Sequence, residues 1–281
     1  MTCREIEMRL GRVGIENARQ ETQLLVAHHT GQSEATLLAR WEDDLPDREG
    51  ALSRAVRLRE QHYPLQYLLG AWSFWRQEYE VSPDCLIPRS DTETLVDCAL
   101  RRLPKGARVL ELCTGSGCIP ISLLCERPDL SAVAVELYPK TLALARRNAA
   151  RNGVGEDRLT FLQADVLAGD FLASLGTFDA ILSNPPYIPS SDLAALQPEV
   201  GYEPSAALDG GTDGLTFYRR MLQEDYRGAL KEGGVWMLEI GYDQGEALRA
   251  LAKQSGCSCD IVRDLGVCDR VAIVTPTHRL E

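Results

Sequence analysis

The stretch Arg108-Val109-Leu110-Glu111-Leu112-Cys113-Thr114-Gly115-Ser116-Gly117 indicates the fold of this chain. Its first half is apolar and of strand length, and its second half is a glycine loop that leads into a helical run at residues 119–125. Glycines at this place let a ligand approach the backbone closely and supply positive φ angles for the turn. The third glycine of the dinucleotide-binding fingerprint is missing, because position 120 is proline. The stretch therefore predicts a ligand-binding strand–loop–helix unit that suits a pyrophosphate poorly.

Strand-like and helix-like segments alternate on both sides of this stretch, from about residue 91 onward. We expect strands at residues 108–112, 131–135, 159–163, 179–183, 235–240, 259–263 and 270–274, and helices at residues 119–125, 139–151, 215–230 and 244–254. Such alternation predicts an α/β domain, with a mostly parallel sheet covered by helices on both faces. In these sheets ligands bind at the carboxyl ends of the strands.

The sequence before residue 91 differs from the rest. Ile6, Leu10 and Val13 form part of an apolar helical stripe, and residues 36–41 and 51–60 suggest two more amphipathic helices. Aromatic residues among polar ones, followed by prolines, then indicate a hairpin over residues 72–90. We therefore expect a helical bundle without chemistry of its own over residues 1–71, a linker, and the α/β domain over residues 91–281.

The composition narrows the class of protein. The 30 basic and 41 acidic residues give a formal net charge of −11, which argues against direct nucleic-acid binding. The nine cysteines contain no CxxC pair, so we expect reduced thiols and no metal site. Charged residues near the N-terminus argue against an export signal, and no apolar run is long enough to span a membrane. We expect a cytoplasmic monomer.

Carboxylates follow three of the predicted strands. Glu111 lies at the end of the first, where a cationic ligand could sit. Glu136 ends the second strand, where a carboxylate can accept hydrogen bonds from both hydroxyls of a ribose. Asp165 follows the third strand and can accept from an adenine amino group, with Val166 against the ring. Each alone is also typical of a solvated strand end, but the glycine loop beside them favours a nucleoside site.

The segment Ser183-Asn184-Pro185-Pro186-Tyr187 follows the fourth strand and carries the strongest chemical signal. Two prolines cannot continue a central strand, so the chain leaves the sheet here on a stiff loop. That loop can hold the Asn184 side-chain oxygen and the Pro185 carbonyl as two converging acceptors, with the flat ring of Tyr187 beside them. An NH2 group on a planar π system fits this pair, because it offers two N–H donors. The segment predicts a planar amino or amide nitrogen as the reacting group.

At these residues the chain resembles the class I, Rossmann-like methyltransferases that carry an Asn/Asp-Pro-Pro-Tyr motif. Further segments resemble the release factor glutamine N5-methyltransferases, which form the HemK/PrmC family. These segments are residues 64–70 (PLQYLLG), 86–93 (LIPRSDTE), 202–204 (YEP), 207–215 (ALDGGTDGL) and 239–245 (EIGYDQG). The likeness covers nearly the whole chain and is weakest over residues 1–60.

The resemblance implies an N-terminal helical bundle, a β-hairpin linker and a seven-stranded catalytic domain. It implies that the enzyme uses S-adenosyl-L-methionine to methylate the glutamine of the Gly-Gly-Gln loop in class 1 peptide chain release factors, which act in translation termination. The helical bundle would then dock the substrate protein. The residues implied to bind the cofactor are Glu111, Cys113, Thr114, Gly115, Ser116, Gly117, Glu136, Asp165, Val166 and Asn184. Those implied to bind the glutamine are Asn184, Pro185, Pro186 and Tyr187, of which Asn184, Pro185 and Tyr187 would be catalytic.

Three of the residues implied to bind the cofactor depart from the commoner family pattern, as does Ser90-Asp91 outside the presumed chemical core. Cys113 stands where many members have glycine, which puts the backbone role of this residue in question. Glu136 replaces an aspartate and is one methylene longer, and Val166 replaces a larger residue. Two other functions stay open from the residues alone. One is an adenine-N6 methyltransferase acting on nucleic acid, which uses a similar acceptor pair on a flipped base. The other is a cofactor-binding scaffold that no longer catalyses.

Overall fold

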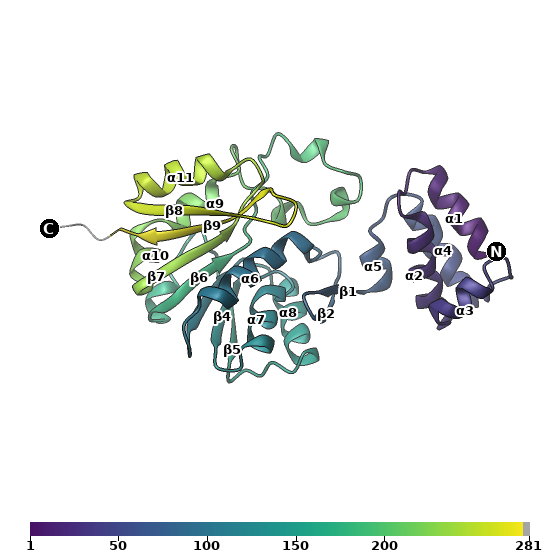
Figure 1. Cartoon of the computed structure of the whole chain (residues 1–281), viewed down its shortest axis with the longest axis horizontal. Coiled ribbons are helices and arrows are strands. Elements are labelled where there is room, and N and C mark those ends of the chain that lie inside the picture. The colour runs from purple at the N-terminus through teal and green to yellow at the C-terminus, as the bar shows by residue number, and fades with distance from the viewer. Residues whose placement is uncertain (278–281) are drawn as a thin grey trace. The chain divides into compact units, whose positions relative to one another are not determined.

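A computed structural model describes residues 1–277 of the chain; residues 278–281, at the end of the expected α/β domain, lie outside the described residues. The described chain divides into two compact units (Figure 1). The first, which we call the helical unit, comprises Met1–Ala71 together with the segment Leu196–Tyr202. The second, which we call the catalytic unit because the sequence predicts the active site within it, comprises Trp72–Ala195 and the chain from Glu203 onward. None of the described helices is long and apolar enough to cross a membrane.

The helical unit begins with a well-capped helix. Thr2 accepts a hydrogen bond from the backbone N–H of Glu5, whose side chain bonds back to Thr2, and this capping box starts α1. The helix buries Ile6 and Leu10, as the apolar stripe predicts, but ends before Val13, which is exposed. The helices of this unit are α1 (Cys3–Arg12), α2 (Ala18–Thr30), α3 (Glu34–Ala39), α4 (Ala51–Arg59) and α5 (Leu65–Leu69), with a 3-10 turn at Arg48–Gly50.

The segment Leu196–Tyr202 is held in the helical unit by a buried arginine. Arg59 is 4% exposed and forms ion pairs with Glu21 at 2.5 Å and with Glu199 at 3.1 Å. The Nδ1 atom of His62 lies 3.0 Å from the same Glu199 carboxylate, and the hydroxyl of Tyr202 donates to the backbone of the helical region. A buried charge is costly unless it is paired. Glu199 therefore both neutralises Arg59 and fixes the segment to the unit.

A β-hairpin, β1 (Ala71–Phe74) and β2 (Gln77–Glu80), follows the helical region, close to the predicted linker. Its turn places Trp75 at a φ of 56°, in the left-handed region. Tyr79 is fully buried, and its hydroxyl lies 2.7 Å from Ser122 on α7 (Cys118–Glu126). The hairpin is therefore packed into the core of the catalytic unit.

Within residues 1–277, seven strands form the central sheet, in the order β5-β4-β3-β6-β7-β9-β8. The strands are β3 (Arg108–Leu112), β4 (Ser131–Glu136), β5 (Leu159–Gln163), β6 (Phe178–Ser183), β7 (Leu230–Glu239), β8 (Cys257–Arg263) and β9 (Asp269–Pro276). Among these described strands, β9 runs antiparallel to both of its neighbours, β7 and β8, and the five strands from β5 to β7 in this order are parallel. This arrangement confirms the expected α/β fold with a mostly parallel sheet.

The region 215–240 differs from the sequence prediction. In place of one helix over residues 215–230, the chain forms α9 (Thr216–Met221) and α10 (Glu224–Gly228), because Gln223 adopts an extended conformation between them. Strand β7 starts at Leu230, and Gly233 does not end a helix. Leu230 pairs with Phe178 and Val235 pairs with Ala180, so residues 231–234 form a bulge. Gly233, at a φ of 75°, supplies the backbone conformation that this bulge requires.

Alternating residues of the strands pack on opposite faces of the sheet. On β3, Val109 belongs to one apolar cluster, whereas Leu110 and Leu112 belong to the other. The helices that pack on the first face are α6 (Glu93–Arg102), α7 and α8 (Pro139–Arg151). Those on the second face are α9, α10 and α11 (Gly245–Gln254), and Figure 1 shows α11 lying along β8 and β9. Both faces are thus buried, which leaves the carboxyl ends of the strands for a ligand.

Candidate active site

A cavity of about 430 Å³ opens at the carboxyl ends of β3, β4, β5 and β6, in the catalytic unit. Nine of the residues expected at the site from the sequence line it: Cys113, Thr114, Gly115, Ser116, Glu136, Asp165, Val166, Asn184 and Pro186. Glu111, Gly117, Pro185 and Tyr187 do not line it. The structure therefore brings four separate sequence motifs to one concave surface, as parallel strands require.

The glycine loop after β3 uses left-handed backbone at three positions. Cys113, Gly115 and Gly117 have φ angles of 60°, 57° and 80°. A Cβ atom at Gly117 would lie 2.8 Å from the side chain of Ile121, so only glycine fits where the loop enters α7. Cys113 adopts the same kind of conformation with a side chain, at a steric cost that glycine would not pay.

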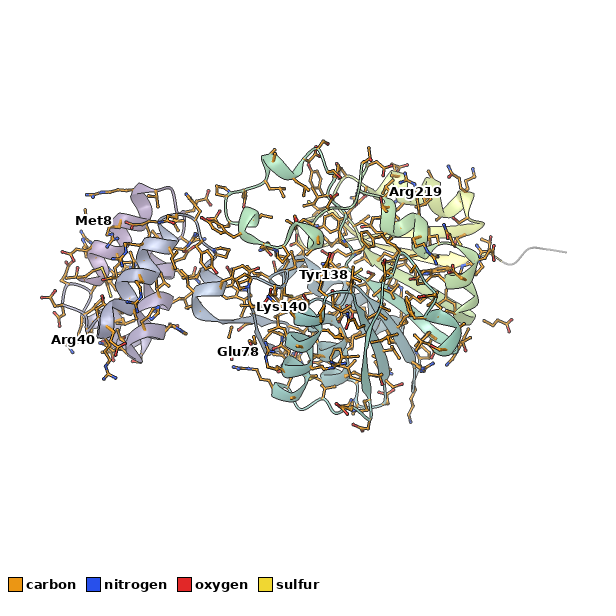
Figure 2. All side chains as sticks on the ribbon, turned by 180° about the vertical axis from the view of Figure 1, so that it is seen from behind. Met8, Arg40, Glu78, Tyr138, Lys140 and Arg219 are labelled. Atoms are coloured by element: carbon orange, nitrogen blue, oxygen red, sulfur yellow. The ribbon has the colours of Figure 1, made fainter. Side chains whose placement is uncertain are left out.

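Glu136 ends β4 and is held rigidly beside the glycine loop. It is 7% exposed, and its two carboxylate oxygens accept hydrogen bonds from the backbone N–H groups of Gly115 and Tyr138, each at 3.0 Å. Burial raises the pKa of Glu136, and these hydrogen bonds oppose the rise. Tyr138, labelled in Figure 2, lines the cavity beside it and is half exposed. Each carboxylate oxygen keeps a lone pair for a hydroxyl donor.

Glu111 lies buried behind the loop, near the end of β3. It is fully buried, and its carboxylate oxygens make no hydrogen bond of ordinary geometry in the described chain, although the Thr114 side chain lies close enough to lower its pKa. Burial raises the pKa of Glu111 well above its ordinary value. A buried carboxyl group without a partner is unfavourable unless a ligand supplies one. Its chemistry therefore suits a cationic or N–H donating group.

The charges that line the cavity also favour a cationic ligand. Four carboxylates and one guanidinium are found among the described lining residues, namely Asp84, Glu136, Asp165, Asp209 and Arg89. An anionic group such as a pyrophosphate would be repelled by this set. No group of three or more His, Cys, Asp or Glu residues in the described chain is arranged to hold a metal ion.

Asp165 and Val166 form the part of the wall that follows β5. Asp165 is exposed, and one of its carboxylate oxygens accepts from the backbone N–H of Leu167 at 2.8 Å. Val166 is 4% exposed, and its carbonyl accepts from the hydroxyl of Tyr226 at 2.7 Å. Asp165 thus keeps one carboxylate oxygen free. The hydrogen bond to the Val166 carbonyl holds the Val166 side chain in place beside it.

The loop after β6 starts from a locked strand end. Ser183 donates through its hydroxyl to the carbonyl of Leu112 at 2.7 Å. The next residue, Asn184, donates from Nδ2 to the hydroxyl oxygen of Thr92 at 3.2 Å, and both residues line the cavity. With its NH2 group bonded to Thr92, Asn184 has its side-chain oxygen available as an acceptor.

Tyr187 is partly buried and does not line the cavity. Its ring packs against the second apolar cluster, and burial raises its pKa to about 12. Its backbone carbonyl accepts a hydrogen bond from Nε2 of Gln244 at 3.0 Å, and a Cβ atom at Gly214 would lie 2.3 Å from the same oxygen. Gly214 has a φ of 72°, so glycine is needed here for both space and backbone conformation. Tyr187 thus anchors the loop between two neighbouring segments.

Sequence reasoning missed two parts of the cavity wall, formed by residues 84–92 and by residues 204–217. The chain between the hairpin and α6 contributes Cys85, Ile87, Arg89 and Thr92 to the lining. Glu203, which is 6% exposed, holds this segment by accepting from the backbone N–H of Ile87 at 2.9 Å and by pairing with Arg89. The stretches 86–93 and 202–204 were both among the family-like segments, but nothing in the sequence shows that they meet.

Comparison with known proteins agrees with this geometry. Residues 90–197 match the methyltransferase small domain family, and residues 2–70 match the PrmC N-terminal domain family. Together with the sheet and the cavity at its carboxyl ends, the first match identifies the protein as an enzyme of the methyltransferase class.

The full-length relatives identify the family within that class. The chain is 43% identical to the release factor glutamine methyltransferase of Geobacter sulfurreducens, over 93% of this chain and 91% of the relative. It is 36% identical to the enzyme of the same name from Escherichia coli, over 92% of each chain. The chain therefore belongs to the release factor glutamine methyltransferase family, as its motifs predict. The crystal structure of a methyltransferase from Pyrococcus furiosus, 18% identical with a TM-score of 0.53, covers 81% of this chain and 96% of its own length and shares the fold.

The left-handed conformation of Cys113 leads to a prediction about stability. Cys113→Gly should be more stable than Cys113→Ala by about 1 kcal/mol, because only glycine adopts this φ without steric cost. The free energies of unfolding would be compared by urea titration. The same pair of substitutions at Cys125, inside α7, is the matched control. There the order should reverse, because glycine weakens a helix. Equal stability of the two Cys113 variants would contradict backbone strain at this site.

Proposed function

We propose that this enzyme transfers a methyl group from S-adenosyl-L-methionine to the side-chain amide nitrogen (N5) of the glutamine in the Gly-Gly-Gln loop of class 1 peptide chain release factors. The observation that carries the proposal is the bond from Asn184 to Thr92, which leaves the Asn184 side-chain oxygen available as an acceptor in the cavity. The names of the relatives, which are release factor glutamine methyltransferases, support the choice of substrate.

The residues around the cavity fit S-adenosyl-L-methionine. Glu136 offers one free lone pair on each oxygen to the two ribose hydroxyls, and Asp165 offers an acceptor to the adenine amino group. Glu111, buried without a partner, suits the ammonium group of the methionine part. When bound, this cofactor supplies an electrophilic methyl group on a positively charged sulfur. The carboxylates of the site favour that charge.

The remaining chemistry is a matter of orientation. An amide nitrogen is a poor nucleophile, because its lone pair is delocalised into the carbonyl. We infer that the Asn184 side-chain oxygen and the Pro185 carbonyl each accept one N–H of the substrate amide. Two such acceptors increase the electron density on nitrogen and hold its lone pair in a fixed direction. Most of the rate enhancement then comes from positioning and preorganised acceptors, and the amide proton leaves after transfer.

Binding of the cofactor should depend on Glu136. Glu136→Ala removes both acceptors for the ribose and should weaken binding of S-adenosyl-L-methionine by about 1–3 kcal/mol. Isothermal titration calorimetry without release factor measures this directly. Glu156→Ala, at an exposed position after α8, is the control and should bind as the wild type does. Unchanged affinity of Glu136→Ala would remove this residue from the cofactor site.

We also propose that the helical unit recognises the body of the release factor. All described residues that line the cavity belong to the catalytic unit, which leaves the helical unit free for another role. The intact factor should therefore be methylated with a kcat/KM at least about 100-fold above that of a short Gly-Gly-Gln peptide, equivalent to roughly 2.7 kcal/mol of added recognition. A peptide that is as good a substrate as the intact factor contradicts this role.

The substrate proposal is tested at Asn184. Asn184→Ala removes one acceptor and should lower the single-turnover rate by about 10²–10³, by analogy with the loss of one oxyanion-hole donor. The cofactor affinity should change little. Asn184→Asp keeps an acceptor and should retain more activity than Ala, despite the cost of burying a carboxylate. An alanine variant as fast as the wild type would refute the amide clamp.

The same assay separates the proposal from its rivals. Transfer of a radiolabelled methyl group to purified release factor is measured with duplex DNA and ribosomal RNA present as competitors. We expect label only in the protein, at one glutamine located by mass spectrometry. Label in adenine bases would make the enzyme a nucleic-acid methyltransferase, and label in none of the three would favour a scaffold.

A further inference from the structure

An acidic residue that does not line the cavity lies beside Asn184. Glu239 is the last residue of β7, and it is 1% exposed. Ser183 and Leu238 are paired in the parallel sheet, so the residues after them, Asn184 and Glu239, emerge side by side at its carboxyl edge. Glu239 does not line the cavity, and the proposed chemistry makes no use of it.

The carboxyl group of Glu239 faces Thr92 and Asn184, the two residues that the Asn184–Thr92 hydrogen bond joins. Burial raises its pKa to about 7, while hydrogen bonding from Thr92 and Asn184 and the charge of Arg270 oppose the rise. Its Oε2 atom has no hydrogen-bond partner among the described residues. The tyrosine Tyr218 donates to the backbone carbonyl of Glu239 at 2.7 Å, which fixes the residue from the other side.

This arrangement distinguishes the oxygen of the Asn184 side-chain amide from its NH2 group. A carboxylate can only accept hydrogen bonds, so in the interaction of Thr92 with Glu239 the Thr92 hydroxyl is the donor. The Thr92 oxygen is then an acceptor, and the amide group of Asn184 must present its NH2 to it, as observed. If the side-chain amide of Asn184 were flipped, its oxygen would face the Thr92 hydroxyl oxygen and the Glu239 carboxylate. No proton would then lie between these acceptors. That orientation leaves buried acceptors unpaired and is unfavourable.

We propose that Glu239 is a positioning residue that fixes the Asn184 amide, directly and through Thr92, so that its oxygen and not its nitrogen faces the substrate. The proposal rests on the proposed function, in which Asn184 accepts a substrate N–H. Glu239 acts while ionised. Once protonated, it can donate to Thr92 or to the Asn184 oxygen, and the preference for one orientation is lost.

Other ionisable groups surround Glu239 and bear on this equilibrium. Arg270 on β9 favours its charged form, and Asp91, in the 3-10 turn before α6, opposes it. Arg270 is itself paired with Asp91 and Asp264, each at 3.1 Å, so part of its charge is already neutralised. The phenol of Tyr187 also faces this group, and its pKa is about 12. Glu239 is therefore the group of this cluster that titrates near neutral pH.

The first test is Glu239→Gln, which keeps the shape and removes the charge. If the new glutamine keeps its oxygen toward Thr92, its NH2 group is buried where Oε2 of Glu239 has no partner. The opposite orientation of the glutamine, with its NH2 group toward Thr92, is therefore favoured. The Asn184 amide then flips in response. The single-turnover rate at saturating cofactor and release factor should fall about tenfold or more. The affinity for S-adenosyl-L-methionine, measured by calorimetry, should match the wild type, which also shows that the variant is folded. A wild-type rate overturns the proposal.

The decisive comparison repeats the substitution in the Asn184→Asp background. An aspartate has two equivalent oxygens and no orientation to set, and it is repelled by Glu239. Glu239→Gln should therefore leave the rate of Asn184→Asp unchanged or raise it, in contrast to its effect beside Asn184. The same fall in both backgrounds means that Glu239 acts only through structure and overturns the proposal.

The pH profile gives an independent readout. The single-turnover rate of the wild type should rise with pH around pH 7, as Glu239 ionises, and that of Glu239→Gln should be low and flat over the same range. An equal pH dependence in both proteins overturns the proposal. Failure of the underlying function looks different, because Asn184→Ala would then be as fast as the wild type.

Discussion

The register of β3 against its two parallel neighbours is the constraint on which the site depends. Leu112 pairs with Val135 on one side and with Ser183 on the other, and the Ser183 hydroxyl bonds to the Leu112 carbonyl. This register makes the three strands end at the same level. The glycine loop, the carboxylate of Glu136 and the Asn-Pro-Pro-Tyr loop then begin at one cavity. A shift by a single residue would turn every side chain of a strand to the opposite face of the sheet.

Acidic groups are buried around that edge of the sheet. Glu111, Glu136 and Glu239 end or nearly end their strands, and burial raises the pKa of each. They are satisfied to different degrees: Glu136 by two backbone N–H groups, Glu239 in part, and Glu111 by none of the described residues. Such groups reduce the stability of the folded protein and are typical of sites that await a ligand or orient one. Three buried carboxyl groups thus lie at or near the carboxyl edge of the sheet, beside the cavity of the proposed cofactor.

Much of the catalytic unit could be predicted from local patterns. The helix Pro139–Arg151 was predicted with its observed bounds, because a proline at its start and Asn152-Gly153 at its end mark the boundaries. The apolar periodicity predicted where these strands end, and the glycine loop indicated which carboxylates at those ends belong to a site. The break at Gln223 and the bulge at Gly233 were missed, since apolar spacing alone does not separate a broken helix from a continuous one. The wall formed by residues 84–92 and the place of Glu239 depend on contacts between distant segments, and no local pattern encodes them.

The segment Leu196–Tyr202 has a consequence for how this enzyme family can vary. The chain leaves the catalytic unit after Ala195 and returns at Glu203, so the helical unit is assembled from two separate pieces of sequence. Arg59 and Glu199 are 140 residues apart, yet they form an ion pair beside the one between Arg59 and Glu21. A chimera that exchanged only residues 1–71 between relatives would bring a foreign surface to Glu199. The helical unit is therefore discontinuous in the sequence, and an exchange of one piece is expected to need a matching change in the other.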